Sequence, residues 1–590
     1  MFGKVLVANR GEIAIRVMRT LAELGIASVA VYSEPDRDAL HVRRADEAYL
    51  LGPGAPSQSY LAVEKLIDAA QRAGAEAIHP GYGFLAENAA FARACDEAGI
   101  VFIGPPADAI EAMGSKTRAR ELMKGAGVPI VPGTTDPVDT VEDAARVIDE
   151  AIGYPVAIKA SGGGGGKGFR VALEADELEK AFEGAAREGE KFFSDPTVYI
   201  ERYLPDPRHV EVQVLADSKG NVIHLGERDC SVQRRHQKLI EESPAPAVDD
   251  ALRERIGSIG TEAARAVGYR SAGTVEGLLA DGEYFFLEMN TRVQVEHCVT
   301  EMTTGIDIVR EQIRIAAGEK LSIAQEDVSL RGHAIECRIN AEDASKNFAP
   351  APGTIGGYRE PAGPGVRLDS GVESGSEVTP LYDPLIAKLI VWDVDRDSAT
   401  RRMIRALGEF ELGGVRSLIA FHIALLGTEQ WARGETCRDL IEDRQWLKQF
   451  AAPKPEPAPE GEEEPQVERS YAVEVSGRRF DVKVVGAAPG VDGAAPAQAG
   501  ARRAPPRRRE RGGAGAGGGA PGTLVSPIQG TVLRVAVEQG AEVEEGALIV
   551  VIEAMKMENE ITAPAAGKVE ELNVTEGGSV STGDTIAVIK

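Results

Sequence analysis

The chain has 590 residues, which is too long for one ordinary hydrophobic core and predicts three to five domains. Its formal charge of −26, from 66 Lys and Arg against 92 Asp and Glu, argues against nucleic acid or an anionic membrane as the main partner. The 5 cysteines form no CxxC pair, which gives no zinc signature and fits a reducing compartment, and no apolar run approaches the ~20 residues of a membrane span, so we expect a cytoplasmic protein.

The N-terminal segment has the pattern of a parallel α/β domain. Residues 4–8 read as a buried strand, residues 13–24 carry the apolar spacing of a helix, and residues 26–31 read as a second strand. This order of strand, helix and strand is typical of parallel sheets. Mixed α/β patterning continues to about Phe450.

A glycine-rich run, SGGGGGKG at residues 161–168, follows an expected strand at residues 155–159. Five consecutive glycines favour neither helix nor strand, but their backbone N–H groups can close over phosphates. A P-loop would need Gly at 161 and Ser or Thr at 168, so that motif is absent and a simple linker remains an alternative. Lys159 and Lys116 could supply positive charge to phosphates, although each is a weak signal by itself.

Residues 274–280 and 284–290 are two strand-like segments around Asp281-Gly282-Glu283. A hairpin with a three-residue loop would place Glu276 directly opposite Glu288 on one face of the sheet. Two facing carboxylates repel each other unless a cation lies between them, and hard oxygen ligands suit Mg²⁺ that bridges ATP phosphates.

Polar residues continue to alternate with other residues after this hairpin. If the chain stays extended, one side carries the five polar groups Glu288, Asn290, Arg292, Gln294 and Glu296. An ordinary strand with one wet face would also alternate. It would not explain why this series of acids, amides and arginine faces a second acid.

The character of the sequence changes after Phe450. Residues 451–466 are rich in Pro and Glu, and residues 487–522 are rich in Ala, Gly, Pro and Arg, so both are expected to be flexible linkers. Residues 467–486 alternate apolar and polar side chains around Ser476-Gly477, which predicts a β-hairpin. We interpret the arginines of the second linker as a solvated stretch rather than a nucleic-acid site.

The last segment, residues 523–590, contains an internal repeat. Pro527, Gly530 and Val532 recur at one constant offset as Pro564, Gly567 and Val569, and the pattern extends to the isoleucines near the C-terminus. Two copies of a short β unit predict a flat β-sandwich with pseudo-twofold symmetry. The turn between the copies carries a lysine between two methionines, at Met555, Lys556 and Met557.

This segment resembles the biotinyl carrier domain, an all-β barrel-sandwich hybrid whose Ala-Met-Lys-Met motif stands here at residues 554–557. A lysine at an exposed turn is ordinarily a solvated charge, but flanking methionines are unfavourable there unless they serve a function. Lipoyl carriers share the sandwich and usually lack the two methionines. The resemblance implies that Lys556 carries covalent biotin, attached by a biotin protein ligase.

Residues 2–447 resemble the ATP-grasp biotin carboxylases. Besides the glycine run and the acidic hairpin, the matching motifs are HPGYGFL at 79–85, ERDCSVQRRHQK at 227–238 and AIECRIN at 334–340. The resemblance implies an α/β multidomain protein with a Rossmann-like N-terminal domain at 1–114, an ATP-grasp domain at 115–330 and a biotin carboxylase C-terminal domain at 331–450.

The resemblance also implies roles for individual residues. The residues expected around ATP are Lys116, Lys159, Gly162, Gly163, Gly164, Gly165, Gly166, Glu201, Leu204, His209, Gln233, His236 and Leu278. The ligands expected for Mg²⁺ or Mn²⁺ are Glu276, Glu288 and Asn290. The residues expected to position bicarbonate are Lys238, Arg292, Gln294 and Val295. Glu296 is expected to be the base, Arg338 to stabilise the biotin enolate and Tyr82 to form the biotin pocket, with Lys238 and Arg292 assisting catalysis.

Two positions depart from the commonest pattern of that family. Arg202 stands where Lys is frequent, and Phe169 stands where Met is frequent after the glycine run. Both substitutions keep charge or bulk, so they put nucleotide affinity in doubt more than activity.

The implied function is ATP- and bicarbonate-dependent carboxylation of biotin on the chain's own carrier domain. No segment is large enough for a carboxyltransferase, so we expect a separate β subunit that transfers the carboxyl group to acetyl-CoA or propionyl-CoA. The chain is expected to form a homo-oligomer within a larger hetero-oligomer, and the hairpin at 467–486 to be a docking element or a spacer. One alternative is the biotin subunit of a pyruvate or other non-acyl-CoA carboxylase. Another is a carrier scaffold without catalysis, against which the intact acidic and basic set argues.

We predict that biotin is attached to Lys556 and to no other residue. After co-expression with a biotin ligase, intact-mass and peptide mass spectrometry should find one biotin, and Lys556→Ala should carry none. Lys568→Ala, which removes a lysine from the other copy of the repeat, should stay biotinylated. Biotin retained on Lys556→Ala would contradict the assignment.

Overall fold

The computed structural model describes the chain except residues 135, 165–166, 194, 236, 452–465, 476–477, 488–522, 527–529, 545, 555–556, 577, 581–583 and 590. The chain divides into one unit of Met1–Ala451 with Leu524–Lys590 and a second unit of Ala452–Thr523. Among the described residues, every helix is too short or too polar to cross a membrane.

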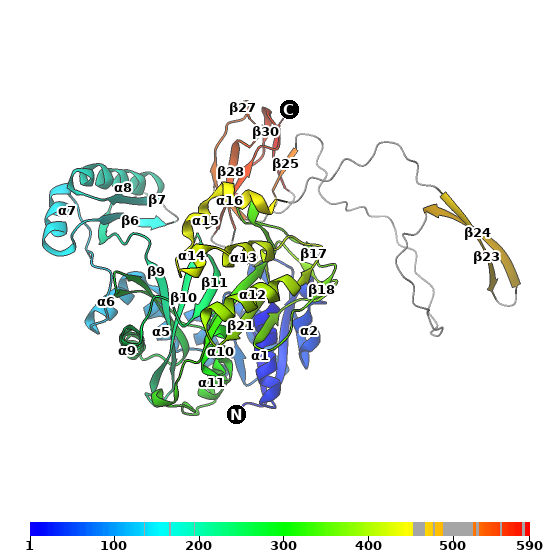
Figure 1. Cartoon of the computed structure of the whole chain (residues 1–590), viewed down its shortest axis with the longest axis horizontal. Helices are drawn as coiled ribbons and strands as arrows, with labels where there is room; N and C mark the ends of the chain where they lie inside the picture. The colour runs from blue at the N-terminus through cyan, green and yellow to red at the C-terminus, as the bar shows by residue number, and fades with distance from the viewer. Residues whose placement is uncertain are drawn as a thin grey trace. The chain divides into compact units, whose positions relative to one another are not determined.

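The N-terminal residues form a parallel sheet of five strands in the order β3-β2-β1-β4-β5 (blue in Figure 1). The strands are β1 (Lys4–Val7), β2 (Ala27–Ser33), β3 (Glu47–Gly52), β4 (Ala77–His79) and β5 (Val101–Phe102). The helices among them are α1 (Gly11–Glu23), α2 (Leu40–Arg44), α3 (Val63–Ala73), α4 (Ala89–Glu97) and α5 (Ala107–Gly114). The expected strand, helix and strand are confirmed, and the predicted helix face is buried at Ile13, Val17 and Leu21.

The largest sheet has eight strands in the order β13-β12-β9-β10-β11-β14-β21-β19. Its strands are β9 (Arg208–Ala216), β10 (Val222–Arg234), β11 (Gln237–Ser243), β12 (Ser271–Ala280), β13 (Glu283–Asn290), β14 (His333–Asn340), β19 (Val366–Ser370) and β21 (Leu385–Asp393). Neighbouring strands are antiparallel throughout. The sheet therefore continues across residue 330, where the sequence suggested a domain boundary.

Helices and short strands cover this sheet (Figure 1). The helices that follow its strands are α9 (Asp250–Ala266), α10 (His297–Thr304), α11 (Ile308–Ala316), α12 (Arg396–Glu409), α13 (Ile419–Leu426), α14 (Glu429–Ala432), α15 (Arg438–Glu442) and α16 (Arg444–Leu447). The short strands are β15 (Glu342–Asp343), β16 (Ala349–Pro350), β17 (Gly353–Thr354), β18 (Tyr358–Arg359), β20 (Glu377–Val378) and β22 (Glu411–Leu412). Buried aliphatic and aromatic residues from α12, α13, β14 and β21 form one core over the sheet.

A second, smaller sheet carries the glycine-rich run. It has the order β7-β6-β8, and its strands are β6 (Val156–Gly164), β7 (Lys167–Ala172) and β8 (Val198–Arg202). The helices α7 (Val141–Val147) and α8 (Leu178–Phe193) pack beside it, whereas α6 (Lys116–Gly125) packs into the core of the larger sheet. Gly162, Gly163 and Gly164 end β6, and Gly164 pairs with Lys167, so the described glycines belong to a β-hairpin rather than a linker.

The hairpin of β12 and β13 does pair Glu276 with Glu288, as predicted, but the predicted three-residue loop is wrong. Ala280 pairs with Glu283, so the loop is only Asp281-Gly282, whose φ angles of 51° and 76° are left-handed. Two-residue loops of this kind match the right-handed twist of the strands. A register shift after Glu276 restores the acidic pair.

The chain does not stay extended from Glu288 to Glu296, so the condition for one continuous row of five polar groups is not met. Strand β13 ends at Asn290, and α10 begins at His297 with Glu296 at its N-cap position. Val293 is fully buried in the core, and this packing turns the intervening segment away from the sheet.

The C-terminal residues form two four-stranded sheets, in the orders β25-β32-β30-β27 and β29-β28-β26-β31. Their strands are β25 (Thr523–Val525), β26 (Gly530–Val535), β27 (Glu542–Val543), β28 (Leu548–Ala554), β29 (Met557–Thr562), β30 (Gly567–Leu572), β31 (Ser579–Val580) and β32 (Thr585–Ile589). The repeat is visible in the core, where Val532 and Val569 are both fully buried. The predicted β-sandwich is confirmed.

Ala554 of β28 pairs with Met557 of β29, on either side of the position expected for the lysine turn. Lys556 itself lies outside the described residues. The expected hairpin also exists, as β23 (Gln466–Val475) paired with β24 (Arg478–Ala487). The linkers at 451–466 and 487–522 lie, apart from their edges, outside the described residues.

Candidate active site

A polar face on the eight-stranded sheet collects most of the predicted site residues. In β9 the residues His209, Glu211 and Gln213 alternate with Val210, Val212 and Val214. The valines pack into the core of the ATP-grasp half, and the strand pleat therefore sends the polar side chains to the opposite face. Both Glu211 and Gln213 are completely buried, so each needs a polar partner.

Lys238 of β11 is the common partner of three of these buried acids. Its Nζ donates to Glu211 Oε2 at 2.6 Å, to Glu276 Oε1 at 3.0 Å and to Glu296 Oε1 at 2.6 Å. Burial lowers the pKa of Lys238, but Cys230 and the three carboxylates outweigh burial and raise the pKa well above its ordinary value. Lys238 is therefore a permanent cation in the centre of the site.

Glu296 lies between Lys238 and Arg338. Its second oxygen, Oε2, accepts a hydrogen bond from Arg338 at 3.0 Å, and Arg338 also donates to Glu241 Oε1 at 2.6 Å. Burial raises the pKa of Glu296, but Lys238, Arg338 and Arg228 outweigh burial and hold the pKa far below the usual range. Glu296 is thus ionised and able to accept a proton when an anion competes for its cations.

The neighbouring Glu241 has the opposite character. Burial and the charge of Glu296 raise the pKa of Glu241 to about 7, although Arg338 and Lys238 act to lower it. The guanidinium of Arg338 thus has a strongly acidic carboxylate on one side and a weakly acidic carboxyl group on the other.

The acidic pair on β12 and β13 fits a hard divalent cation. Glu276 Oε1 accepts hydrogen bonds from Lys238 and from Asn290 Nδ2 at 2.7 Å, and its Oε2 lies 2.9 Å from His209 Nε2. Glu288 is directly opposite Glu276 and half-buried. Carboxylate and amide oxygens are ligands of Mg²⁺ or Mn²⁺, so Glu276, Glu288 and Asn290 have the chemistry of the predicted metal site, although here the Asn290 amide turns its nitrogen to Glu276 and its oxygen to Arg292.

The predicted bicarbonate residues lie in the irregular segment between β13 and α10. Arg292 donates to Glu87 Oε2 at 2.8 Å and to Asn290 Oδ1 at 2.9 Å. Gln294 is 2% exposed and joins Arg228 to Glu276. The carbonyl of Val295 accepts a hydrogen bond, so this segment is held at several points.

The residues predicted around ATP are only partly brought together. Lys159 of β6 forms an ion pair with Glu201 of β8, whose other oxygen lies 3.1 Å from Arg120. Leu278 is paired with His209 across β12 and β9, and Gln233 with Lys238 across β10 and β11. The described glycines Gly162, Gly163 and Gly164 end β6, and Leu204 is half-buried after β8. Gly165, Gly166, His236 and the side chain of Lys116 lie outside the described residues.

Tyr82, predicted in the biotin pocket, is half-buried at the edge of the N-terminal sheet. Its hydroxyl donates to Glu12, and its carbonyl accepts from Asn9 Nδ2 at 2.7 Å. Burial and the Glu12 charge raise the pKa of Tyr82 well above the ordinary value, whereas the charge of Arg338 lowers it. This electrostatic influence relates Tyr82 to the catalytic cluster.

Sequence reasoning missed three residues of this cluster, which are Glu211, Arg228 and Glu241. Arg228 is completely buried and donates to Glu211, Gln213 and Gln294. A signal existed, because the alternation of β9 would have identified a polar face at Glu211. No comparable signal marks Arg228, which stands among other charged residues in β10.

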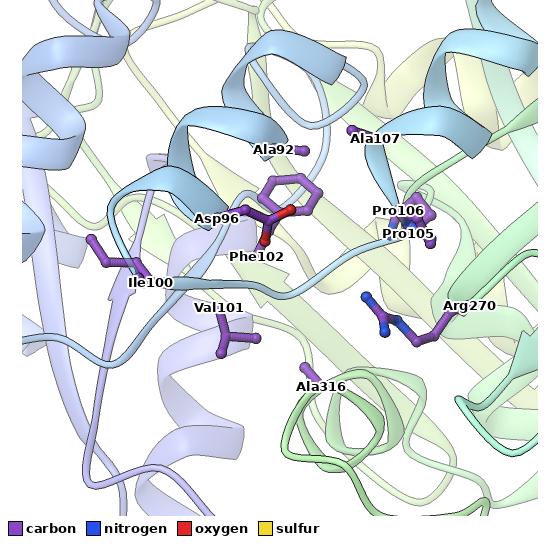
Figure 2. Close-up of a pocket in the computed structure, with 11 residues that line it drawn as sticks. Ala92, Asp96, Ile100, Val101, Phe102, Pro105, Pro106, Ala107, Arg270 and Ala316 are labelled. Atoms are coloured by element: carbon purple, nitrogen blue, oxygen red, sulfur yellow. The ribbon is translucent and has the colours of Figure 1, made fainter.

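A separate pocket of about 360 Å³ lies away from these residues, among α4, β5, α5 and Ala316 of α11 (Figure 2). Most of the residues that line it have apolar side chains, and Asp96 and Arg270 are its charged residues. None of the predicted catalytic, ATP, metal or bicarbonate residues lines it. The described pocket and the candidate active site are therefore different places.

Family models match four successive parts of the chain. They are "Biotin carboxylase, N-terminal domain" at residues 1–110, "Carbamoyl-phosphate synthase L chain, ATP binding domain" at 115–324, "Biotin carboxylase C-terminal domain" at 336–443 and "Biotin-requiring enzyme" at 520–589.

Two curated relatives illustrate the range of similarity. The biotin-dependent acyl-coenzyme A carboxylase alpha3 subunit of Mycobacterium leprae is 46% identical over 592 residues, which covers 100% of this chain and 98% of the relative. A pyruvate carboxylase subunit of Methanothermobacter thermautotrophicus is 57% identical over 443 residues, which covers 75% of this chain and 90% of the relative.

Solved structures of biotin carboxylase domains are also similar to this chain. The biotin carboxylase domain of a thermophilic 2-oxoglutarate carboxylase bound to bicarbonate is 50% identical, with a TM-score of 0.72 over 76% of this chain and 99% of that one. The same domain from Hydrogenobacter thermophilus with MgADP and bicarbonate is 51% identical, with a TM-score of 0.69 over 77% of this chain and 100% of that one.

The antiparallel sheet, the glycine hairpin and the acidic site define an ATP-grasp enzyme. The chain belongs to the biotin carboxylases, and it contains a biotin-requiring carrier domain in the same polypeptide. Its activity is the ATP-dependent carboxylation of biotin.

We predict that Arg228→Leu destabilises the protein by about 3–5 kcal/mol, because it leaves the buried carboxylate of Glu211 with fewer cationic partners. Denaturant titration measures this loss. Arg93→Leu, which removes an exposed ion pair with Glu111, should change the midpoint far less. Equal midpoints for Arg228→Leu and wild type would contradict a supporting role for Arg228.

Proposed function

We propose that this chain is the α subunit of an acyl-CoA carboxylase, whose separate carboxyltransferase β subunit moves the carboxyl group from biotin to acetyl-CoA or propionyl-CoA, giving malonyl-CoA or methylmalonyl-CoA. One observation carries the proposal. The similarity to the M. leprae acyl-CoA carboxylase subunit extends over the whole chain, including the region between carboxylase and carrier. The proposal includes a biotin protein ligase as the partner that loads Lys556.

A second candidate is the biotin subunit of a pyruvate or 2-oxoglutarate carboxylase. The high identity to the M. thermautotrophicus pyruvate carboxylase subunit favours it, but that match covers only 75% of the chain. Both candidates use the same first half-reaction, so the residues of the carboxylase site do not discriminate between them. The acceptor substrate is chosen by the partner subunit.

The first step of the proposed mechanism makes bicarbonate a nucleophile. Lys238, Arg292 and Gln294, with Val295, bind the anion beside Glu296. Bicarbonate competes for Lys238, which weakens the hold of the cations on Glu296 and raises its pKa toward that of a useful base. Glu296 takes the proton, and the bicarbonate oxygen attacks the terminal phosphorus of ATP while the bond to ADP breaks, giving carboxyphosphate.

Glu276, Glu288 and Asn290 would hold Mg²⁺ or Mn²⁺, which supplies positive charge to the ATP phosphates when bound. Lys159 and the backbone of the glycine hairpin approach the phosphates from the smaller sheet. Closure of this hairpin excludes water, which would otherwise hydrolyse carboxyphosphate.

The second step carboxylates biotin. Carboxyphosphate breaks into CO₂ and phosphate, and the phosphate takes the proton from the ureido nitrogen of biotin. The enolate oxygen that results needs a cation that does not itself lose the proton, and a guanidinium meets this need. Arg338 is held by Glu296 and Glu241, so its orientation is set before biotin arrives.

We predict that Glu296→Ala and Arg338→Ala fail at different steps. Glu296→Ala should abolish bicarbonate-dependent ATP cleavage and biotin carboxylation together, because no carboxyphosphate forms. Arg338→Ala should lose biotin carboxylation and keep part of the bicarbonate-dependent ATP cleavage. Each loss should be at least ~100-fold.

The measurement is phosphate release with and without bicarbonate and free biotin, accompanied by a thermal melt. Arg93→Ala, on the surface, is the control and should keep both activities. Folded variants of both residues with wild-type rates would show that the polar face is structural only.

The acceptor substrate is tested with the full biotinylated chain. Capture from a lysate of the native host should recover a carboxyltransferase subunit. The purified complex should fix bicarbonate into acetyl-CoA or propionyl-CoA at a rate at least ~10-fold above that into pyruvate or 2-oxoglutarate. A complex that carboxylates pyruvate or 2-oxoglutarate but neither acyl-CoA would overturn the acyl-CoA assignment in favour of the second candidate.

A further inference from the structure

Lys388, in the middle of β21, is a completely buried cation outside the residues discussed so far. Strand register places it between Arg338 on β14 and Asp369 on β19, so the three residues form one row across the sheet. Its side chain is 0% exposed. Two cations side by side in a dry interior are unfavourable unless each has fixed partners.

The partners of Lys388 are defined by four contacts. Nζ donates to the carbonyl oxygen of Val295 at 2.8 Å and to Cys298 Sγ at 3.2 Å. Glu12 Oε2 lies at 3.4 Å and Asp369 Oδ2 at 4.0 Å. Burial lowers the pKa of Lys388, but Cys298 and the surrounding carboxylates outweigh burial and raise the pKa above its ordinary value. Lys388 is therefore a charged donor.

The contact with Val295 matters because of where that carbonyl lies. The segment from Thr291 to Glu296, between β13 and α10, belongs to neither a strand nor a helix. Glu296 follows Val295 directly, so a shift of the Val295 carbonyl moves the base relative to Lys238 and Arg338. A charge-assisted hydrogen bond from the rigid centre of β21 restrains that peptide.

The contact with Glu12 connects Lys388 to the expected biotin pocket. Glu12 is 4% exposed and accepts the hydroxyl hydrogen of Tyr82, the residue expected to line the biotin pocket. Lys388 thus touches both the segment that carries the base and the acid that orients Tyr82. It reaches neither Glu296 nor a substrate position itself.

We propose that Lys388 is a positioning residue for biotin carboxylation, which fixes the Val295–Glu296 peptide and, through Glu12, the Tyr82 side of the biotin pocket. This inference rests on the roles proposed above for Val295, Glu296 and Tyr82. A buried methionine of similar length would fill the same space without an uncompensated cation, so packing alone does not require a lysine here.

The test compares Lys388→Met with wild type in the full-length biotinylated chain. The hydrogen bond to Val295 is lost, so KM for bicarbonate should rise by about 10- to 100-fold, the range expected for a hydrogen bond to a charged donor. Carboxylation of free biotin should fall at least as much. KM for ATP should stay within about twofold, because Lys388 touches no residue predicted around the nucleotide.

Two further variants separate positioning from stability. Arg367→Met removes a half-buried cation of the same network, which binds Glu301 and Asp369. It should lower the melting temperature and leave KM for bicarbonate within about twofold of wild type. The double variant Lys388→Met/Asp369→Asn removes one cation and one anion together, so it restores the charge balance of the cluster without restoring the donor to Val295.

The expected result is a double variant that recovers much of the melting temperature and keeps the raised KM for bicarbonate. Recovery of both quantities would overturn the proposal, since Lys388 would then act only through stability. A wild-type KM in folded Lys388→Met would overturn it as well. If either of these results is found and Glu296→Ala is inactive, only the proposal for Lys388 is wrong. If Glu296→Ala is active, the proposed mechanism on which the role of Lys388 rests is wrong.

Discussion

The site depends on one constraint, which is that several carboxylates are buried together around the ammonium group of Lys238. Glu211, Glu276 and Glu296 come from β9, β12 and the segment before α10, and all three accept hydrogen bonds from it within 3.0 Å. In an interior of low effective dielectric constant, their mutual repulsion would separate these elements without the cation. In the proposed mechanism, an anionic substrate binds by exchange, because it takes over cations that the protein's own acids hold beforehand. The same exchange explains how an acid as strong as Glu296 becomes a proton acceptor only in the substrate complex.

Much of the fold followed from local pattern, and the errors have physical causes. The facing of Glu276 and Glu288 was predicted from strand spacing and is correct, although a two-residue loop and a register shift replace the predicted three-residue loop. Those two errors cancelled, because a bulge adds the residue that the shorter loop lacks. Alternation left open whether the chain stays extended to Glu296, and it does not. Alternation says nothing about Val293, which is buried in a core built from several elements. Sequence patterns describe faces of single strands, whereas this turn is decided by packing between elements.

The residues of the candidate site also divide into those that a strand pattern identifies and those that depend on packing between elements. The polar face that His209 and Glu211 share could have been identified from alternation along β9, but Glu211 was missed and His209 was supplied by the resemblance to a family. Glu241 and Lys388 are different, since each matters through a neighbour far away in sequence. The pairing of Arg338 with Lys388 and the approach of Lys388 to Val295 exist only once β14, β21 and α10 are assembled. No spacing rule within β21 distinguishes this lysine from a misplaced surface charge.

The continuity of the eight-stranded sheet across residue 330 has a mechanical consequence. Lys238, Glu276 and Arg338 are anchored in β11, β12 and β14, which belong to one hydrogen-bonded framework. The glycine hairpin belongs to the separate sheet of β6, β7 and β8. A hinge motion that admits or releases nucleotide can therefore be carried by the small sheet alone. The groups proposed to hold the metal, the bicarbonate and the enolate, which are Glu276, Lys238 and Arg338, keep a common frame of reference, so opening for the nucleotide need not loosen the chemistry beside it.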